Sequence, residues 1–128
     1  MGNTSGSPAE RRATATAALA AVDRHLSARR RLDVRCRRSH HVAAVYDIGG
    51  DLVYRAVTGT RGHGHNDRVS VGHRGDARGR PYADLLDAGD DPLVEDSLPA
   101  SCECGPRMLS RSALLTSIDQ QQRHLLVD

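Results

Sequence analysis

The sequence predicts an α+β fold, in which an N-terminal helix packs on a small antiparallel sheet and a second helix lies near the C-terminus. Two patterns indicate this class. The N-terminal part carries a complete helix-start signal followed by an Ala-rich segment, and the middle alternates β-branched and aromatic residues around a glycine pair. With 128 residues, the chain is long enough for one domain and too short for two independent cores.

The composition predicts a thin hydrophobic core. Apolar residues make up 38% of the chain, against about 45 to 50% in typical domains, a range that includes Gly. Aromatic residues make up only 2%, and Phe and Trp are absent. Small domains short of core usually gain stability from a disulfide, a metal or a partner chain. Three cysteines, an odd number, favour metal binding or free thiols over a disulfide framework.

The first elements follow from local signals. Residues 1–6 are small and polar, and we expect a flexible tail. Ser7 is a suitable N-cap, Pro8 suits the first helical position, and Glu10 completes a capping box. These signals predict a helix over residues 7–31. Its narrow apolar stripe comprises Ala15, Leu19, Val22 and Leu26.

From Leu32 onward the pattern changes from helix to strand. Residues 42–48 and 51–57 are two β-branched and aromatic runs that flank Gly49-Gly50, which predicts a β-hairpin with a two-residue turn. Residues 32–38 can add a strand beside it.

The C-terminal half contains weaker signals. We expect mostly loop over residues 59–79, with a hint of a short strand, and a short helical turn or strand over 82–86. Segment 87–100 is acidic and interrupted by Gly and Pro, so we expect it to form a loop as well. Ser110 is a suitable N-cap for a helix that ends at Gln121 or Gln122, and residues 125–127 indicate a closing strand.

Cysteine and histidine residues form two close pairs that are far apart in the sequence. Zinc sites usually take about four thiolate or imidazole ligands, presented as two such pairs. The predicted ligands are Cys36, His40, Cys102 and Cys104, with His41 as the alternative histidine. Adjacent strand residues point to opposite faces, so only one of the two histidines can join the site, and the Cys-x3-His spacing favours His40.

Two alternatives to this site remain open from the sequence. Cys36 could be a buried small hydrophobe and the Cys-x-Cys pair part of a loop, because zinc ribbons usually have two residues between the cysteines. A second histidine group, His63, His65 and His73, could be a metal or catalytic group, or could donate a ligand to the first site. The explanation favoured by the sequence is a solvated Gly-His loop.

The charges are divided between two segments. Residues 24–38 contain seven arginines and one acid, whereas residues 84–103 contain seven acids and no base. Arginines at this density can bind phosphates, or the two segments can neutralise each other. The predicted nucleic-acid-binding residues are Arg24, Arg29, Arg30, Arg31, Arg35, Arg37 and Arg38.

Around Cys36, and again at Cys102-Glu103-Cys104-Gly105, the chain resembles small uncharacterised zinc-ribbon-like proteins of actinobacteria and their phages. The exclusive use of Arg over Lys is also typical of GC-rich coding sequences. The resemblance covers residues 32–128 and implies one zinc-stabilised domain over 7–128. It implies zinc as the metal and Cys36, His40, Cys102 and Cys104 as ligands, and it leaves the activity open.

Together these observations favour a non-enzymatic adaptor or regulator that acts on nucleic acid or on a transcription or translation complex. One alternative is a metal-dependent hydrolase or nuclease that uses His63, His65 and His73. Another is a structural or inhibitory protein, of phage origin for example, that binds a protein partner. The sequence has no signal-peptide pattern and no run of about 18 apolar residues, so we expect a cytoplasmic protein without a membrane partner.

Overall fold

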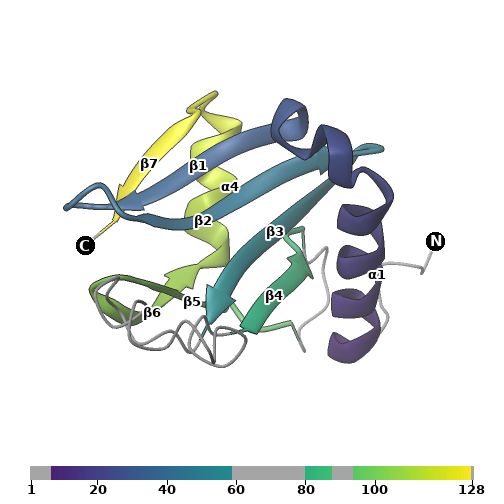
Figure 1. The fold of residues 1–128 in the computed structure, drawn as a ribbon, viewed down its shortest axis with the longest axis horizontal. Helices are drawn as coiled ribbons and strands as arrows, with labels where there is room; N and C mark the ends of the chain where they lie inside the picture. Colours follow the sequence, from purple (N-terminus) through teal and green to yellow (C-terminus); the bar gives the residue numbers. More distant parts are fainter. Residues whose placement is uncertain (1–6, 59–79, 88–93, 128) are drawn as a thin grey trace, which may run out of the picture.

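The computed structural model describes residues 7–58, 80–87 and 94–127, so the expected tail at 1–6 and loop at 59–79 lie outside the described residues. The α+β class is confirmed (Figure 1). In chain order the elements are α1 (Pro8–Ala21), the 3-10 helix η2 (Asp23–Arg29), β1 (Arg30–Cys36), β2 (His41–Ile48), β3 (Asp51–Thr58), β4 (Arg80–Leu85), β5 (Ser97–Cys102), β6 (Gly105–Ser110), α4 (Arg111–Asp119) and β7 (His124–Val127).

The N-terminal helix starts as predicted and ends early. The Ser7 N–H donates to Glu10 Oε1 at 2.8 Å, and the Ser7 hydroxyl accepts from the Glu10 N–H at 3.2 Å, which completes the capping box. The predicted extension to residue 31 is wrong, because α1 ends at Ala21 and β1 begins at Arg30. Strand pairing that fully buries Leu32 outweighs the helical tendency of the arginines around it.

The main sheet has five strands in the order β4-β3-β2-β1-β7. The β2–β3 hairpin is confirmed, and its two turn residues, Gly49 and Gly50, have φ values of 61° and 91°. Positive φ at both positions is what a type I′ turn requires. The sheet is mixed rather than purely antiparallel, because α4 carries the chain back and β7 pairs in parallel with β1.

A second, two-stranded sheet is formed by β5 and β6. Within the segment 87–100, where the sequence predicted loop, β5 begins at Ser97. Residues 80–85 form β4, which decides between the two predictions for that region in favour of a strand. The C-terminal helix has the predicted cap, since the Ser110 hydroxyl accepts from the Ala113 N–H at 3.1 Å.

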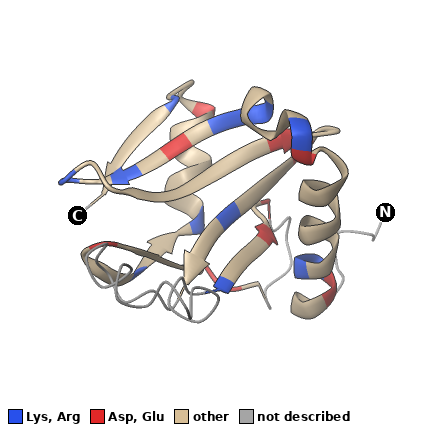
Figure 2. Cartoon of the chain, viewed as in Figure 1, with Lys and Arg blue, Asp and Glu red and all other residues tan. Residues whose placement is uncertain are grey.

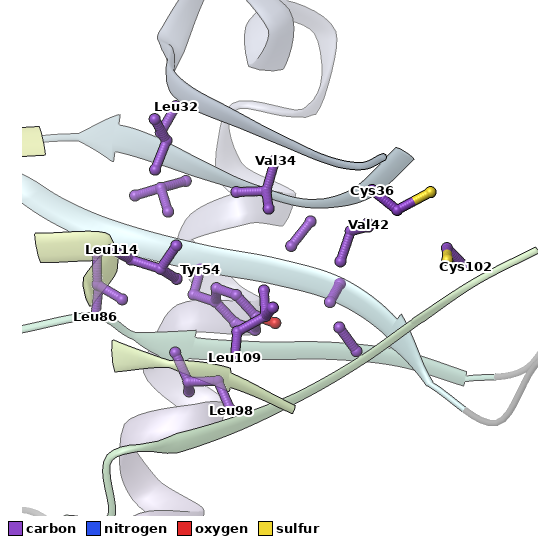
Figure 3. Packing of buried hydrophobic residues seen from close by; sticks show 14 residues of the cluster. Leu32, Val34, Cys36, Val42, Tyr54, Leu86, Leu98, Cys102, Leu109 and Leu114 are labelled. Atoms are coloured by element: carbon purple, nitrogen blue, oxygen red, sulfur yellow. The ribbon is translucent and has the colours of Figure 1, made fainter. Parts of the chain in front are cut away.

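The core lies between the five-stranded sheet on one side and the β5–β6 hairpin with α4 on the other (Figures 1 and 3). Its largest fully buried side chains are Tyr54, Leu32, Leu86, Leu98, Leu114 and Val34. A smaller cluster of Ala15, Val53 and Ala83 lies where α1 packs on the opposite face, beside β3 and β4. The cysteines Cys36 and Cys102 lie at one end of the larger cluster (Figure 3).

Candidate metal centre

Two hairpin turns face each other at one end of the core. Cys36 is the last residue of β1, and His40 directly precedes β2. Cys102 is the last residue of β5, and Cys104 directly precedes β6. The ligand atoms of these four side chains all lie within 4.8 Å of one another, so the fold brings together the predicted group.

The β1–β2 turn folds back sharply on itself. The Cys36 N–H donates to the His40 carbonyl at 3.0 Å, and the Ser39 N–H donates to the Cys36 carbonyl at 2.8 Å. Ser39 has a φ of 70°, a left-handed conformation that few non-glycine residues adopt. This turn returns the chain so that His40 reaches the same site as Cys36.

The same turn prepares Cys36 as a ligand. Burial acts to raise the pKa of Cys36, but hydrogen bonds from the backbone N–H groups of His40 and Arg38, and from the two neighbouring thiols, outweigh burial. The pKa therefore falls to about 7. Thiolate is the form that binds a metal, so the backbone of the turn favours metal binding at this sulfur.

The β5–β6 turn explains the short spacing between the two later cysteines. Cys102 pairs with Gly105 across the hairpin, which leaves Glu103 and Cys104 as a two-residue turn. Gly105 has a φ of 123°, a conformation that side chains rarely allow. The Cys104 N–H lies 3.4 Å from the Cys102 sulfur. The single intervening residue thus places both sulfurs in the same group instead of separating them.

The histidine of the group is His40. Its Nδ1 lies 3.4 Å from the Cys104 sulfur, whereas Nδ1 of His41 lies 3.3 Å from an oxygen of Asp33. A bulge in β2 accompanies this separation, because Arg35 pairs with His41 while the preceding residue, Val34, pairs with Ala43. The predicted alternative, His41, therefore lies outside the group.

Three thiols and one imidazole fit a tetrahedral metal ion. Burial, the Cys36 thiol and the charge of Cys102 raise the pKa of Cys104, so several thiolates this close need a cation to hold them together. Cys36, His40, Cys102 and Cys104 lie close enough to hold a metal ion and are compatible with zinc. Four protein ligands also fill a tetrahedron, which is typical of structural sites and leaves no open position for substrate.

Glu103, which the sequence analysis did not assign, adds a contact behind the site. Its Oε1 lies 3.6 Å from Nε2 of His40, on the opposite side of the ring from Cys104. A carboxylate in this place holds a histidine ring in orientation and leaves the other nitrogen for the metal. An acidic residue between the two cysteines that the sequence predicted as ligands was the signal.

The predicted nucleic-acid-binding arginines have different roles in the fold (Figure 2). Arg24, Arg29, Arg37 and Arg38 are exposed. Arg31 instead donates to the carbonyls of Gln122 and Ile118, both at 2.7 Å, and thereby caps the C-terminus of α4. Its guanidinium is committed to the fold, which the sequence did not reveal because these carbonyls lie about ninety positions away.

The acidic segment has partners of its own. Arg111, which the sequence analysis also missed, is buried and donates to Asp84 Oδ2 at 3.1 Å. Asp96 accepts from the Ser110 hydroxyl at 2.6 Å and from the Ser112 N–H at 2.8 Å, at the N-terminus of α4. Asp33, within the basic segment, accepts from Arg35 at 2.8 Å. The contacts of Asp84 and Asp96 account for two acids that the sequence left as possible partners of the arginine-rich segment.

The alternative catalytic residues His63, His65 and His73 lie outside the described residues. Within residues 7–58, 80–87 and 94–127, no helix is long and apolar enough to span a bilayer.

No family model, curated protein or solved structure matches this chain, so its resemblance to zinc-ribbon-like proteins stays a prediction.

Proposed function

We propose that this chain is a non-enzymatic zinc-binding adaptor or regulator that acts on nucleic acid or on a nucleoprotein complex. The observation that carries the proposal is the Cys3His group, whose ligand atoms lie within 4.8 Å of one another between two hairpin turns. Zinc is the metal that such a ligand set prefers when it is tetrahedral and structural.

The ligand set supports a stabilising rather than a catalytic role. Catalytic zinc sites usually have three protein ligands and a water, whereas this group offers four side chains. A structural metal would also add stability that the core lacks, because the aromatic content of the chain is only 2%. We also propose a cytoplasmic location, where reducing conditions keep the three thiols available to a metal.

The exposed arginines support nucleic acid as the partner. Arg37 and Arg38 lie in the β1–β2 turn, next to the metal group, and Arg24 and Arg29 are exposed on η2. A metal that fixes the β1–β2 turn would also hold the two turn arginines in place. Such residues neutralise phosphates and make binding strongly dependent on salt.

Metal analysis of the purified protein tests the first half of the proposal. We expect one zinc per chain in the wild type and loss of zinc in Cys102→Ser, with His41→Ala as the matched control that keeps its metal. A stable wild-type protein that contains no metal would contradict the zinc assignment.

Binding to DNA and RNA at low salt tests the second half. We expect the zinc-loaded protein to bind, and binding to weaken as salt rises. No binding at low salt would contradict the nucleic-acid assignment. A cleavage activity that is lost in His65→Ala would favour a metal-dependent hydrolase instead.

A further inference from the structure

A single carboxylate gathers arginine and histidine side chains from three neighbouring strands. Asp33, in the middle of β1, is largely buried, and its oxygens lie 2.8 Å from Arg35 Nε and 3.9 Å from Arg30 Nη1. They also lie 3.3 Å from Nδ1 of His41 on β2 and 3.9 Å from Nδ1 of His124 on β7. One negative charge thus holds two guanidinium groups and two imidazoles against the same face of the sheet.

The carboxylate stays ionised in this setting. Burial acts to raise the pKa of Asp33, but the hydrogen bond and the charge of Arg35, with further help from His41 and Arg30, lower it below its usual value. One carboxylate cannot neutralise two arginines. The cluster therefore keeps a net positive charge at neutral pH, even though its guanidinium groups are held in place.

Further arginines extend the positive charge along and across the sheet. Asp33 pairs with Ala44 on β2, and Ala44 pairs with Arg55 on β3, so the side chains of Asp33 and Arg55 share one face about 10 Å apart. Arg123, just before β7, donates to the Arg30 carbonyl at 3.4 Å. We call Arg30, Arg35 and Arg55, together with Arg123 where its guanidinium lies beside the Arg30 carbonyl, the basic sheet face. Figure 2 shows blue, basic segments on both β1 and β3, and Figure 1 shows α4 behind the sheet and α1 beside β4.

The basic sheet face has no Phe, Tyr or Trp ring on which a base could stack. The chain has no Phe or Trp, and none of its three tyrosines is exposed. Proteins that bind single strands usually stack bases on such rings, whereas contacts to the phosphate backbone need only fixed donors and positive charge. Arginines on a rigid sheet supply fixed donors and positive charge, but they supply no aromatic ring for stacking.

We propose that the basic sheet face binds the phosphate backbone of double-stranded nucleic acid without reading its sequence. This inference rests on the proposed function and narrows both the partner and the surface. The duplex is favoured because it presents a rigid array of phosphates and needs no stacking. The binding surface contains Arg30 and Arg35 from the arginine-rich segment 24–38. It also contains Arg55 and Arg123, which are distant from that segment in the sequence.

Binding of labelled duplexes, measured by fluorescence anisotropy, tests the inference on the zinc-loaded protein. The probes are two unrelated 20-base-pair DNA duplexes and one single strand of each sequence. Four phosphate contacts would give a slope of about −3.6 in log affinity against log salt, which is roughly a 150-fold loss of affinity between 50 and 200 mM salt. Both duplexes should bind equally well and at least ten-fold more tightly than the single strands.

The variant Arg35→Gln/Arg55→Gln should reduce the size of the slope by about 1.8 and weaken duplex binding roughly ten-fold or more. Arg12→Gln/Arg80→Gln removes the same charge from α1 and the β4 edge and should change the affinity less than three-fold. An unchanged zinc content in each variant would show that its fold is retained.

The possible outcomes separate the two proposals. A protein that binds single strands more tightly than duplexes overturns the inference and leaves the proposed function standing. An equal loss of duplex affinity in both double variants does the same. Absence of binding to every nucleic acid overturns both. Binding to an acidic polypeptide such as polyglutamate, without binding to duplex, would assign the basic sheet face to a protein partner and also overturns the inference.

Discussion

The β5–β6 hairpin is fastened to the five-stranded sheet at both of its ends, by two different kinds of chemistry. At the turn, Cys102 and Cys104 meet Cys36 and His40. We call this the metal end. At the open end, the buried Arg111 follows β6 directly, and we call this the arginine end.

The contacts at the arginine end use one side chain to join three segments. Arg111 donates to the carbonyls of Leu85 at 2.6 Å, Leu86 at 3.1 Å and Glu95 at 3.0 Å, and to the carboxylate of Asp84 at 3.1 Å. All of these partners belong to the chain itself. The arginine end therefore forms whenever the chain folds, whereas the metal end also needs a cation and reduced thiols.

Removal of the metal should have the largest effect and tests whether the arginine end can hold the hairpin alone. Structural zinc contributes roughly 10 kcal/mol or more in small domains, which is comparable with the whole stability of a domain. We expect a chelator to unfold most of the chain, as measured by far-ultraviolet circular dichroism, and added zinc to restore the signal. An unchanged melting temperature after chelation would show that the core and the arginine end suffice.

Loss of the arginine end should rank second. Arg111→Met leaves Asp84 buried without its cation and takes a side-chain donor from the carbonyls of Leu86 and Glu95, which should cost about 3 to 5 kcal/mol of unfolding free energy in urea. Adding Asp84→Leu to this variant should recover part of the loss, because the unpaired charge is then removed. Arg80→Met, at an exposed position on β4, should change the stability by less than about 0.5 kcal/mol.

A third change tests the support behind the metal end without removing a ligand. Glu103→Gln removes the charge beside Nε2 of His40, and the affinity for zinc should fall roughly 10- to 100-fold in competition with a chromophoric chelator. Glu95→Gln lies at the arginine end and should leave the affinity unchanged. Equal affinities in both variants would mean that the glutamate does not orient the histidine.

The smallest effect concerns pH at the arginine end. A hydrogen bond from the Ser110 hydroxyl, with the Ser112 N–H, lowers the pKa of Asp96 below its usual value of 3.8. The folded chain therefore holds this proton less tightly than the unfolded chain does, so Asp96 stabilises the fold above its usual pKa. That contribution is lost as pH falls through the lower folded value.

Chemical unfolding of the wild type and Asp96→Asn at several pH values measures this contribution. The difference in unfolding free energy should be constant above about pH 5 and shrink below pH 4, where Asp96 takes up a proton in the unfolded chain before it does so in the folded chain. The metal end should weaken at higher pH than this, since protons compete with zinc for thiolate and imidazole. A difference that is independent of pH would contradict the role of Asp96.

Much of the metal end could be predicted from the sequence, because ligand chemistry depends on residue type. Cysteine and histidine at suitable spacing identify zinc ligands wherever the fold places them, and the group contains the four predicted residues. The caps at Ser7 and Ser110 and the Gly49-Gly50 turn were predictable for a similar reason, since each acts on its immediate neighbours.

The arginine end and the basic sheet face could not be predicted in this way. Arg111 and Arg31 bind carbonyls, which every residue has, so nothing in the sequence identifies their partners. Residues 97–102 contain a proline and follow an acidic run, which hid β5. The early end of α1 depends on the pairing of β1 with β2 and β7, a non-local contact that overrides local preference.

The parallel pairing of β7 with β1 has a consequence for how the chain is made. Asp33 pairs with His124, and Arg31 binds the Gln122 carbonyl 91 positions away. The ribosome therefore completes β1 long before the strand that flanks it on one side exists. Contacts this distant in sequence slow folding and leave strand edges exposed meanwhile. The sheet can be completed only after residue 127 has been synthesised and β7 has left the ribosome.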